Sequence, residues 1–279
     1  MSPSPRITPQ AADPYHEPRR EHCPWCGGAR LRTRARAAAP GRRGPGACAV
    51  DQCRDCGHAF QNPRFTVEGL AFHHRNFSAR RLEDLADRSP TRAVRRRHRA
   101  AARTVLPLAE PESWLDVGTG HARFPETVRE VFPYTSFDGL DPTPRVEQAR
   151  LAGRVEEAHI GDLTNPWVLP RLYARYDVVS MFHHLEHAPD PRAELHAALA
   201  ALRPGGLLIL ELPNPQSVFA MLLGRRWPPY RQPRHLHLLP LANLCEELES
   251  QGCDILTTDR RARFSNTYRI VARRHTETS

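Results

Sequence analysis

The chain has 279 residues, of which 40% are hydrophobic and 25% are charged, and its formal net charge is +9. This length accommodates a catalytic domain with a sizeable buried sheet and a smaller module beside it. No apolar run approaches the roughly 18 residues of a membrane-spanning helix, and residues 1–10 carry no hydrophobic signal core. From these features we expect a soluble, cytoplasmic protein with no membrane-spanning helix.

The positive charge is concentrated in the first third of the chain. Residues 1–103 contain 21 Arg and 9 acidic residues, whereas residues 104–279 contain 19 Arg and 22 acidic residues. The chain contains no Lys and is rich in Pro, which also fits the codon usage of a GC-rich genome. We interpret the Arg-rich run at 95–99 as a solvated helix face, with contact to nucleic acid or a phosphorylated substrate as the alternative.

The N-terminal part begins with a Pro-rich, polar stretch and continues with paired cysteines. Residues 1–20 are expected to be a disordered tail. Two Cys-x-x-Cys pairs follow, each with a glycine directly after it, and such twin pairs are typical of a four-thiolate zinc site. Disulfides are disfavoured in a cytosolic chain, and a redox pair needs no twin. The predicted zinc ligands are Cys23, Cys26, Cys53 and Cys56.

A four-thiolate site leaves no open coordination position, so the predicted zinc is structural. Cys48, His22 and His58 are close enough in sequence to be alternative ligands. We expect a zinc ribbon over residues 21–62, because a segment of this size cannot bury a core of its own. A basic connector follows over residues 63–103, with a helix at 82–103.

The most informative motif is an apolar run that starts at Ser113 and breaks into a turn with Gly118 and Gly120. A strand that turns sharply into a helix needs glycines there, and they allow a ligand to approach the main chain. Asp141 ends the next apolar segment, where doubly wound sheets place an acid that binds ribose hydroxyls. The stretch therefore predicts a nucleotide site.

Further strand ends recur every 20 to 30 residues, at Asp162, Met181 and Leu210. Helical stretches separate them, which is the rhythm of βαβ units and a parallel sheet. Residues 203–206 are interpreted as a turn that leads into the fifth strand. The helix Leu241–Ser250 comes after an aromatic, Pro-rich excursion. Cys245 and Cys253 are interpreted as ordinary thiols on or near this helix.

Over roughly residues 104–275 the chain resembles the class I S-adenosylmethionine-dependent methyltransferases. The resemblance implies an α/β, Rossmann-like domain over 104–279. Its seven-stranded, mostly parallel sheet would be completed by strands near 254–258 and 268–272, the last of them antiparallel. It also implies S-adenosyl-L-methionine as the cofactor. We expect the connector helix to pack over the opening of the cofactor site. The cofactor-binding residues that match the family motifs are Asp116, Gly118, Thr119, Gly120, Asp141, Pro142, Asp162 and Leu163.

Other segments resemble a bacterial group of these enzymes that has an N-terminal zinc ribbon and modifies sugars or natural-product intermediates. The shared features are the turn at residues 62–64 and a Trp…Pro-x-His-Leu stretch at 227–240. The segment at 182–190 resembles the one that follows the fourth strand in the small-molecule branch of the methyltransferases. The segment at 72–77 departs from the group, because phenylalanines and a histidine replace its tyrosines. The excursion at 227–240 is where a lid and the substrate pocket are expected.

Methyl transfer to a hydroxyl requires in-line geometry and a base with a pKa near neutrality, for which histidine is the usual residue. The candidate bases are His187, His235 and His237. Two alternatives stay open: His187 orders its loop without acting as a base, or Glu186 and nearby histidines bind a divalent metal ion that assists a catechol-like acceptor.

The expected function is methylation of a hydroxyl on a sugar, glycan or natural-product intermediate, with a small-molecule or saccharide partner and no membrane. The alternative is a methyltransferase for ribosomal or other RNA. One bacterial group of ribosomal-RNA methyltransferases resembles this chain at residues 56–60, and the basic N-terminal region suits phosphate contacts. The Pro-Pro segment that orients an exocyclic amine is absent after Met181. A third possibility, a binding protein without turnover, is disfavoured by the intact cofactor motifs.

Overall fold

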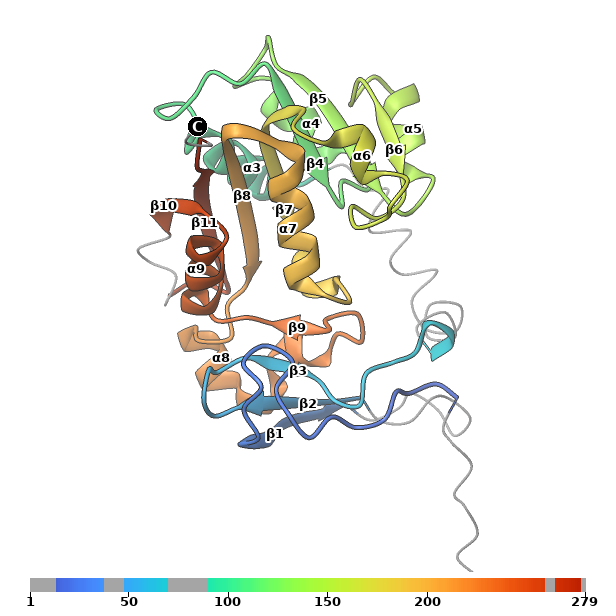
Figure 1. The fold of residues 1–279 in the computed structure, drawn as a ribbon, viewed down its shortest axis with the longest axis vertical. Helices are drawn as coiled ribbons and strands as arrows, with labels where there is room; N and C mark the ends of the chain where they lie inside the picture. The colour runs from blue at the N-terminus through green and yellow to red at the C-terminus, as the bar shows by residue number, and fades with distance from the viewer. Residues whose placement is uncertain (1–13, 38–47, 70–89, 259–263, 277–279) are drawn as a thin grey trace, which may run out of the picture.

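The computed structural model describes residues 14–37, 48–69, 90–258 and 264–276, and these form two sheets (Figure 1). A seven-stranded sheet occupies the larger part of the molecule. A four-stranded sheet lies beyond the end of that sheet toward which strand β8 points. The segment at 72–77 lies outside the described residues. Within the described part of the chain, no helix is both long enough and apolar enough to cross a bilayer.

The large sheet has the strand order β10-β11-β8-β7-β4-β5-β6. Strands β6, β5, β4, β7 and β8 pair in parallel, whereas β11 is antiparallel to both β8 and β10. The predicted mostly parallel sheet with an antiparallel last strand is therefore confirmed. The strands are β4 (Ser113–Val117), β5 (Ser136–Asp141), β6 (Ala158–Ile160), β7 (Tyr176–Phe182), β8 (Leu202–Pro213), β10 (Cys253–Thr258) and β11 (Thr267–Arg274).

Helices cover both faces of this sheet and bury one apolar layer on each. One layer contains Leu115 and Met181, and the other contains Trp114 and Phe137. The alternation follows from the strand geometry, since successive side chains point to opposite faces. The helices are α3 (Arg92–Arg103), α4 (Arg123–Val128), α5 (Arg145–Leu151), α6 (Leu169–Leu172), α7 (Pro191–Ala201), α8 (Val218–Leu223) and α9 (Leu241–Ser250), joined by the short 3-10 helices η2 (Leu185–His187), η3 (Gly224–Arg226) and η4 (Pro228–Arg231).

Two predicted boundaries differ from the structure. Residues 203–206 were expected to be a turn, but they lie within β8, where the pairing with β7 jumps from Leu202 to Leu207. Gly205 has a φ of +79° there, so the extra residues bulge without ending the strand. The predicted connector helix at 82–103 corresponds to α3, and residues 82–89 lie outside the described part.

The small sheet contains the predicted ribbon and one strand from far along the chain. Its order is β1 (Leu31–Ala37), β2 (Cys48–Cys53), β3 (Ala59–Gln61) and β9 (His237–Leu238). Against this sheet, Ala35 and Val50 pack with Trp227, Tyr230 and Leu238 in one apolar cluster. The excursion after β8 therefore supplies the core that the ribbon is too short to form by itself.

Residues 14–20 were expected to belong to a disordered tail, yet they lie against the ribbon. His16 forms an isolated bridge with Phe65, and its ring stacks on the ring of Phe65 at 4.6 Å. The backbone N–H of Arg20 donates to Asn62 Oδ1 at 2.8 Å. These directed contacts offset the conformational entropy that residues 14–20 lose when they become ordered. The polar composition of the stretch gives no sign of these contacts.

Candidate cofactor, catalytic and zinc sites

The glycine turn after β4 has the backbone shape that its sequence requires. Gly118 and Gly120 have φ values of +72° and +54°, in the left-handed region that favours glycine. At Gly118 a Cβ atom would also lie only 2.5 Å from Nδ1 of His184. His184 is held there by a hydrogen bond between its Nε2 and Glu194 Oε1 at 2.8 Å. The turn is thus packed from the side of the segment that follows β7.

Asp116 organises this turn from below. Its side chain is buried, with Oδ1 accepting from Ser180 Oγ at 2.6 Å and Oδ2 accepting from Thr119 Oγ1 at 2.7 Å. Burial raises the pKa of Asp116 to about 6, although the two hydrogen bonds favour the charged form. Both oxygens accept from protein donors, so Asp116 holds the side chain of Thr119 in place within the turn.

Asp141 lies at the carboxyl end of β5, next to the turn. Its Oδ2 accepts from the backbone N–H of Gly120 at 2.9 Å, and its Oδ1 accepts from the backbone N–H of Thr143 at 2.9 Å. The other predicted cofactor residues follow neighbouring strands: Pro142 comes directly after β5, while the exposed Asp162 and the buried Leu163 come after β6. The structure therefore brings the predicted set to adjacent strand ends, and their ligand contacts stay a prediction.

His187 and His235 face each other although they come from different segments. His187 ends the short helix η2 after β7, and His235 precedes β9; their ring centroids are 5.1 Å apart. Nδ1 of His187 lies 2.8 Å from the carbonyl oxygen of Arg234, and Nδ1 of His235 lies 3.1 Å from that of Pro229. Because a carbonyl only accepts, each Nδ1 carries the proton and each Nε2 keeps its lone pair.

Burial keeps both rings neutral. It lowers the pKa of His187, and it lowers the pKa of His235 to about 4, with the nearby His187 adding to the effect. Beside them Glu186 is fully buried, and its Oε2 has no hydrogen-bond partner among the described residues. Burial alone would raise the pKa of Glu186, but the hydrogen bond from His183 holds it below its usual value.

The structure places His237 differently from the other two candidate bases. Its Nδ1 lies 3.2 Å from Nε2 of His58, and the two rings stack at 5.2 Å. Burial lowers its pKa to about 4. His237 is therefore engaged with the ribbon, whereas His187 and His235 form a pair of their own.

An ionic cluster beside the histidine pair was not foreseen from the sequence. Glu211, at the end of β8, is buried and pairs with Arg97 of α3 and with Arg269 of β11. Nη2 of Arg97 also lies 2.8 Å from Nε2 of His183. Burial would raise the pKa of Glu211, but the two guanidinium groups hold it low. Arg97 was interpreted as part of a solvated face; the only sequence signal was an acid at the end of the fifth strand.

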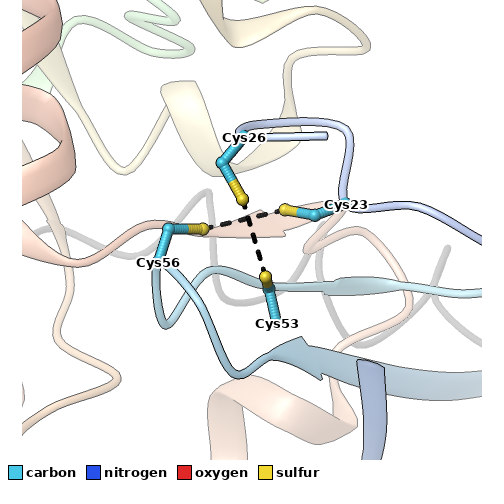
Figure 2. A group of neighbouring side chains, drawn as sticks. All are labelled: Cys23, Cys26, Cys53 and Cys56. Atoms are coloured by element: carbon cyan, nitrogen blue, oxygen red, sulfur yellow. Dashed lines mark hydrogen bonds between the residues drawn. The ribbon is translucent and has the colours of Figure 1, made fainter. Parts of the chain in front are cut away.

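The four predicted zinc ligands converge, as Figure 2 shows. The Sγ atoms of Cys23 and Cys56 are 3.7 Å apart, those of Cys26 and Cys53 are 3.6 Å apart, and all four lie within 4.8 Å of one another. A tetrahedral zinc ion with Zn–S bonds of about 2.3 Å requires edges of about 3.8 Å. The separations therefore fit a zinc ion, and they are too long for disulfide bonds.

The surroundings of the sulfur atoms also fit a metal site. Backbone N–H groups of Trp25 and Asp55 donate to Cys23 Sγ and Cys53 Sγ, each at 3.4 Å. Burial raises the pKa of Cys23 to about 11, so the thiolate needs a cation to stabilise it. His58 Nδ1 contacts Cys23 Sγ at 3.6 Å from outside the four-sulfur group.

Comparison with known proteins agrees with this architecture. A family profile described as a methyltransferase domain matches residues 73–258. The ubiquinone biosynthesis O-methyltransferase of Aeromonas salmonicida is 32% identical over 84 residues, which cover 28% of this chain and 35% of that protein. That of Salmonella typhi is 31% identical over 94 residues, covering 33% and 38%. The chain thus matches little more than a third of the length of these relatives.

Solved structures share the fold at low identity. A putative methyltransferase in complex with the Haloferax volcanii Trm112 activator has a TM-score of 0.53 and 17% identity, covering 70% of this chain and 98% of that one. A possible histamine N-methyltransferase from Thermotoga maritima, described as SAM-dependent, has a TM-score of 0.52 and 16% identity, covering 72% and 97%. The [4+2]-cyclase SpnF has a TM-score of 0.53 and 18% identity, covering 68% and 84%. These likenesses concern the fold alone, whereas the profile covers two thirds of the sequence, and the chain belongs to the methyltransferase domain family.

Proposed function

We propose that this protein transfers a methyl group from S-adenosylmethionine to a hydroxyl of a sugar, glycan or natural-product intermediate. The observation that carries the proposal is the pair of neutral histidines, His187 and His235, each with a free Nε2 lone pair. The pair lies in the segments that follow β7 and β8. Strand β7 is the neighbour of β4, and the glycine turn directly follows β4. The O-methyltransferase function of the curated relatives supports an oxygen acceptor.

The cofactor would be held by the carboxyl ends of β4, β5 and β6. Asp141 offers a carboxylate to the ribose, the backbone at Gly118 and Gly120 permits close approach, and Asp162 and Leu163 flank the adenine side. Bound S-adenosylmethionine supplies an electrophilic methyl group on a sulfonium. Everything else falls to the chain: it aligns the acceptor, excludes water and removes the hydroxyl proton.

Either His187 or His235 can take that proton at Nε2. Both rings are neutral at pH 7 and have their Nδ1–H groups anchored by backbone carbonyls, so Nε2 is oriented before the acceptor binds. The hydrogen bond of His237 to His58 removes it from this role in the proposal. His235, two residues earlier in the same segment, remains a candidate for the base.

A metal-assisted form of the same reaction has its own supporting observation. One ligand atom each from Glu186, His187 and His235 lie within 4.8 Å of one another, and Glu186 Oε2 is buried without a partner among the described residues. Two imidazole nitrogens and a carboxylate suit a divalent ion, and the carbonyl-anchored Nδ1 atoms are typical of metal-binding histidines. In this form an ion would orient the acceptor oxygen.

Two contacts of α3 favour a small acceptor over RNA. Arg97 is engaged with Glu211, and Arg99 pairs with Glu130, so two members of the Arg-rich run are neutralised within the protein. An RNA enzyme would keep these groups for phosphates. RNA binding that weakens steeply with salt would support the alternative.

The function is tested with the full-length protein, methyl-labelled S-adenosylmethionine and a panel of hydroxylated acceptors. The His187→Ala and His235→Ala variants are compared with His196→Ala, which removes an exposed histidine of α7. Label should appear on an acceptor oxygen, drop sharply in at least one of the first two variants and persist in the third. The same panel with a chelator, followed by added Mg²⁺ or Mn²⁺, separates the metal-assisted form. Label transferred only to RNA would refute the proposal.

A further inference from the structure

The lid residue His235 is held in place from two sides. The next backbone N–H, that of Leu236, donates to the carbonyl oxygen of Glu186 at 2.8 Å. The carbonyl oxygen of Leu236 accepts from the backbone N–H of Gln61 at 3.0 Å, and Gln61 Nε2 donates to the carbonyl oxygen of Pro233 at 3.0 Å. Strand β3 of the ribbon therefore holds the segment that carries His235 through hydrogen bonds. The short helix η2, which carries His187, holds the same segment from its other side.

The hydrogen bonding between β3 and this segment continues into β9. His237 pairs with Phe60, and Leu238 pairs with Ala59, in an antiparallel ladder. Strand β3 begins three residues after Cys56 and is only three residues long. Its position is consequently set by the cysteine turn in front of it.

His58 joins the sulfur cluster to the lid strand. It is fully buried, with Nδ1 at 3.6 Å from Cys23 Sγ and Nε2 at 3.2 Å from Nδ1 of His237. A zinc-bound thiolate has no proton, so it accepts from the Nδ1–H of His58. Nε2 of His58 is then the acceptor for the Nδ1–H of His237. This arrangement assigns one tautomer to each ring and leaves Nε2 of His237 buried without a hydrogen-bond partner among the described residues.

We propose that His58 and His237 are positioning residues that transmit the geometry of the four-cysteine zinc site to His235, and through it to the His187–His235 pair. The proposal deepens the proposed function, because it concerns the orientation of the suggested base. An apolar pair would fill the same space without leaving buried nitrogens to satisfy, whereas a hydrogen-bonded pair fixes the rotation of both rings.

The directional nature of the contact gives matched variants. In His58→Asn the amide nitrogen reaches the place of Nδ1 and keeps the bond to Cys23, but nothing reaches His237. In His237→Asn the amide still reaches His58, whereas His237→Phe fills the space without any bond. His196→Asn is the control, since His196 is an exposed histidine on α7.

The test uses the zinc-loaded full chain with ¹⁵N-labelled histidine. Zinc content, ring signals of His187 and His235, S-adenosylmethionine affinity and methyl-transfer kinetics are measured in parallel. We expect one zinc ion per chain and parental cofactor affinity throughout. His58→Asn and His237→Phe should shift or broaden the His235 signals and lower kcat about 10- to 100-fold, with a smaller change in KM, as expected for a displaced catalytic group. His237→Asn and His196→Asn should resemble the parent.

Unmoved His235 signals in zinc-loaded His58→Asn and His237→Phe would overturn the proposal. If His58→Asn loses zinc or fails to fold, His237→Phe decides alone, because it changes no residue near the cysteines in sequence. The ring signals need no acceptor substrate. Shifted signals in a protein that transfers no methyl group would therefore refute the proposed function and support the coupling.

Discussion

The rings of His187 and His235 lie 5.1 Å apart, and each donates its Nδ1–H to a backbone carbonyl of the segment 227–240. The carbonyl that accepts from His187 belongs to Arg234, the residue directly before His235. The position of one candidate base is thus tied to the backbone of the other.

Removal of the base should lower the rate of methyl transfer without weakening the binding of the cofactor. We expect His187→Ala or His235→Ala, whichever removes the base, to reduce kcat by about 10²- to 10⁴-fold. Burial lowers the pKa of both rings, that of His235 to about 4, and only the neutral ring accepts a proton. The parental rate should therefore hold as pH falls from 8 through the ordinary histidine pKa of about 6.5, and decline only at lower pH. A rate that halves near pH 6.5 would contradict these environments.

Asp141 should be required for cofactor binding. Asp141→Ala removes the carboxylate from the end of β5 and the acceptor of the Gly120 N–H, so the turn loses both a ligand group and its anchor. Calorimetry should show at least a tenfold weaker affinity, which corresponds to about 1.4 kcal/mol. Asp254→Ala, at an exposed position in β10, serves as the control. Equal affinities of the two variants for S-adenosylmethionine would refute the assignment.

Zinc should be stoichiometric and structural. We expect one ion per chain in the parent and in Cys245→Ala, and none in the Cys23→Ser/Cys53→Ser double variant. Because the ribbon shares its apolar cluster with Trp227 and Tyr230, loss of zinc should also loosen the lid and increase the fluorescence response of Trp227 to quenchers. A metal-free protein with an unchanged unfolding transition would argue against the zinc site.

The Glu211 cluster should stabilise the fold. Glu211→Gln leaves Arg97 and Arg269 without their shared counter-ion, so we expect a loss of about 2 kcal/mol in the free energy of unfolding at pH 7. Glu249→Gln, at an exposed position in α9, should have little effect. The folded-state pKa of Glu211 is depressed, so its contribution is complete above the unfolded pKa near 4.3 and is lost as pH falls through the folded value. Urea unfolding at pH 7 and at pH 3 measures the difference, which should shrink at the lower pH.

The sequence was most informative where local chemistry decides the structure. The left-handed backbone at 118 and 120 favours glycine, the two Cys-x-x-Cys pairs predict that four sulfur atoms converge, and the spacing of the apolar runs predicts the sheet. Each of these signals lies within a short window of residues. The helix Leu241–Ser250 was predicted with the bounds that the structure shows.

Contacts between segments that are far apart in the sequence could not be predicted from such local patterns. The pairing of β9 with β3, the approach of Arg97 to Glu211 and the engagement of His237 with His58 depend on how the excursion after β8 folds back. Nothing local distinguishes His235 from His237, which are two residues apart. Their different partners arise from which side of the lid meets the ribbon.

The most direct test of the account is transfer of a labelled methyl group from S-adenosylmethionine to a hydroxylated acceptor by the parent and by the His187→Ala/His235→Ala double variant. The account predicts label on an acceptor oxygen with the parent, and nearly complete loss in the double variant at unchanged cofactor affinity. Full transfer by the double variant, or label found on nitrogen or RNA alone, would contradict it.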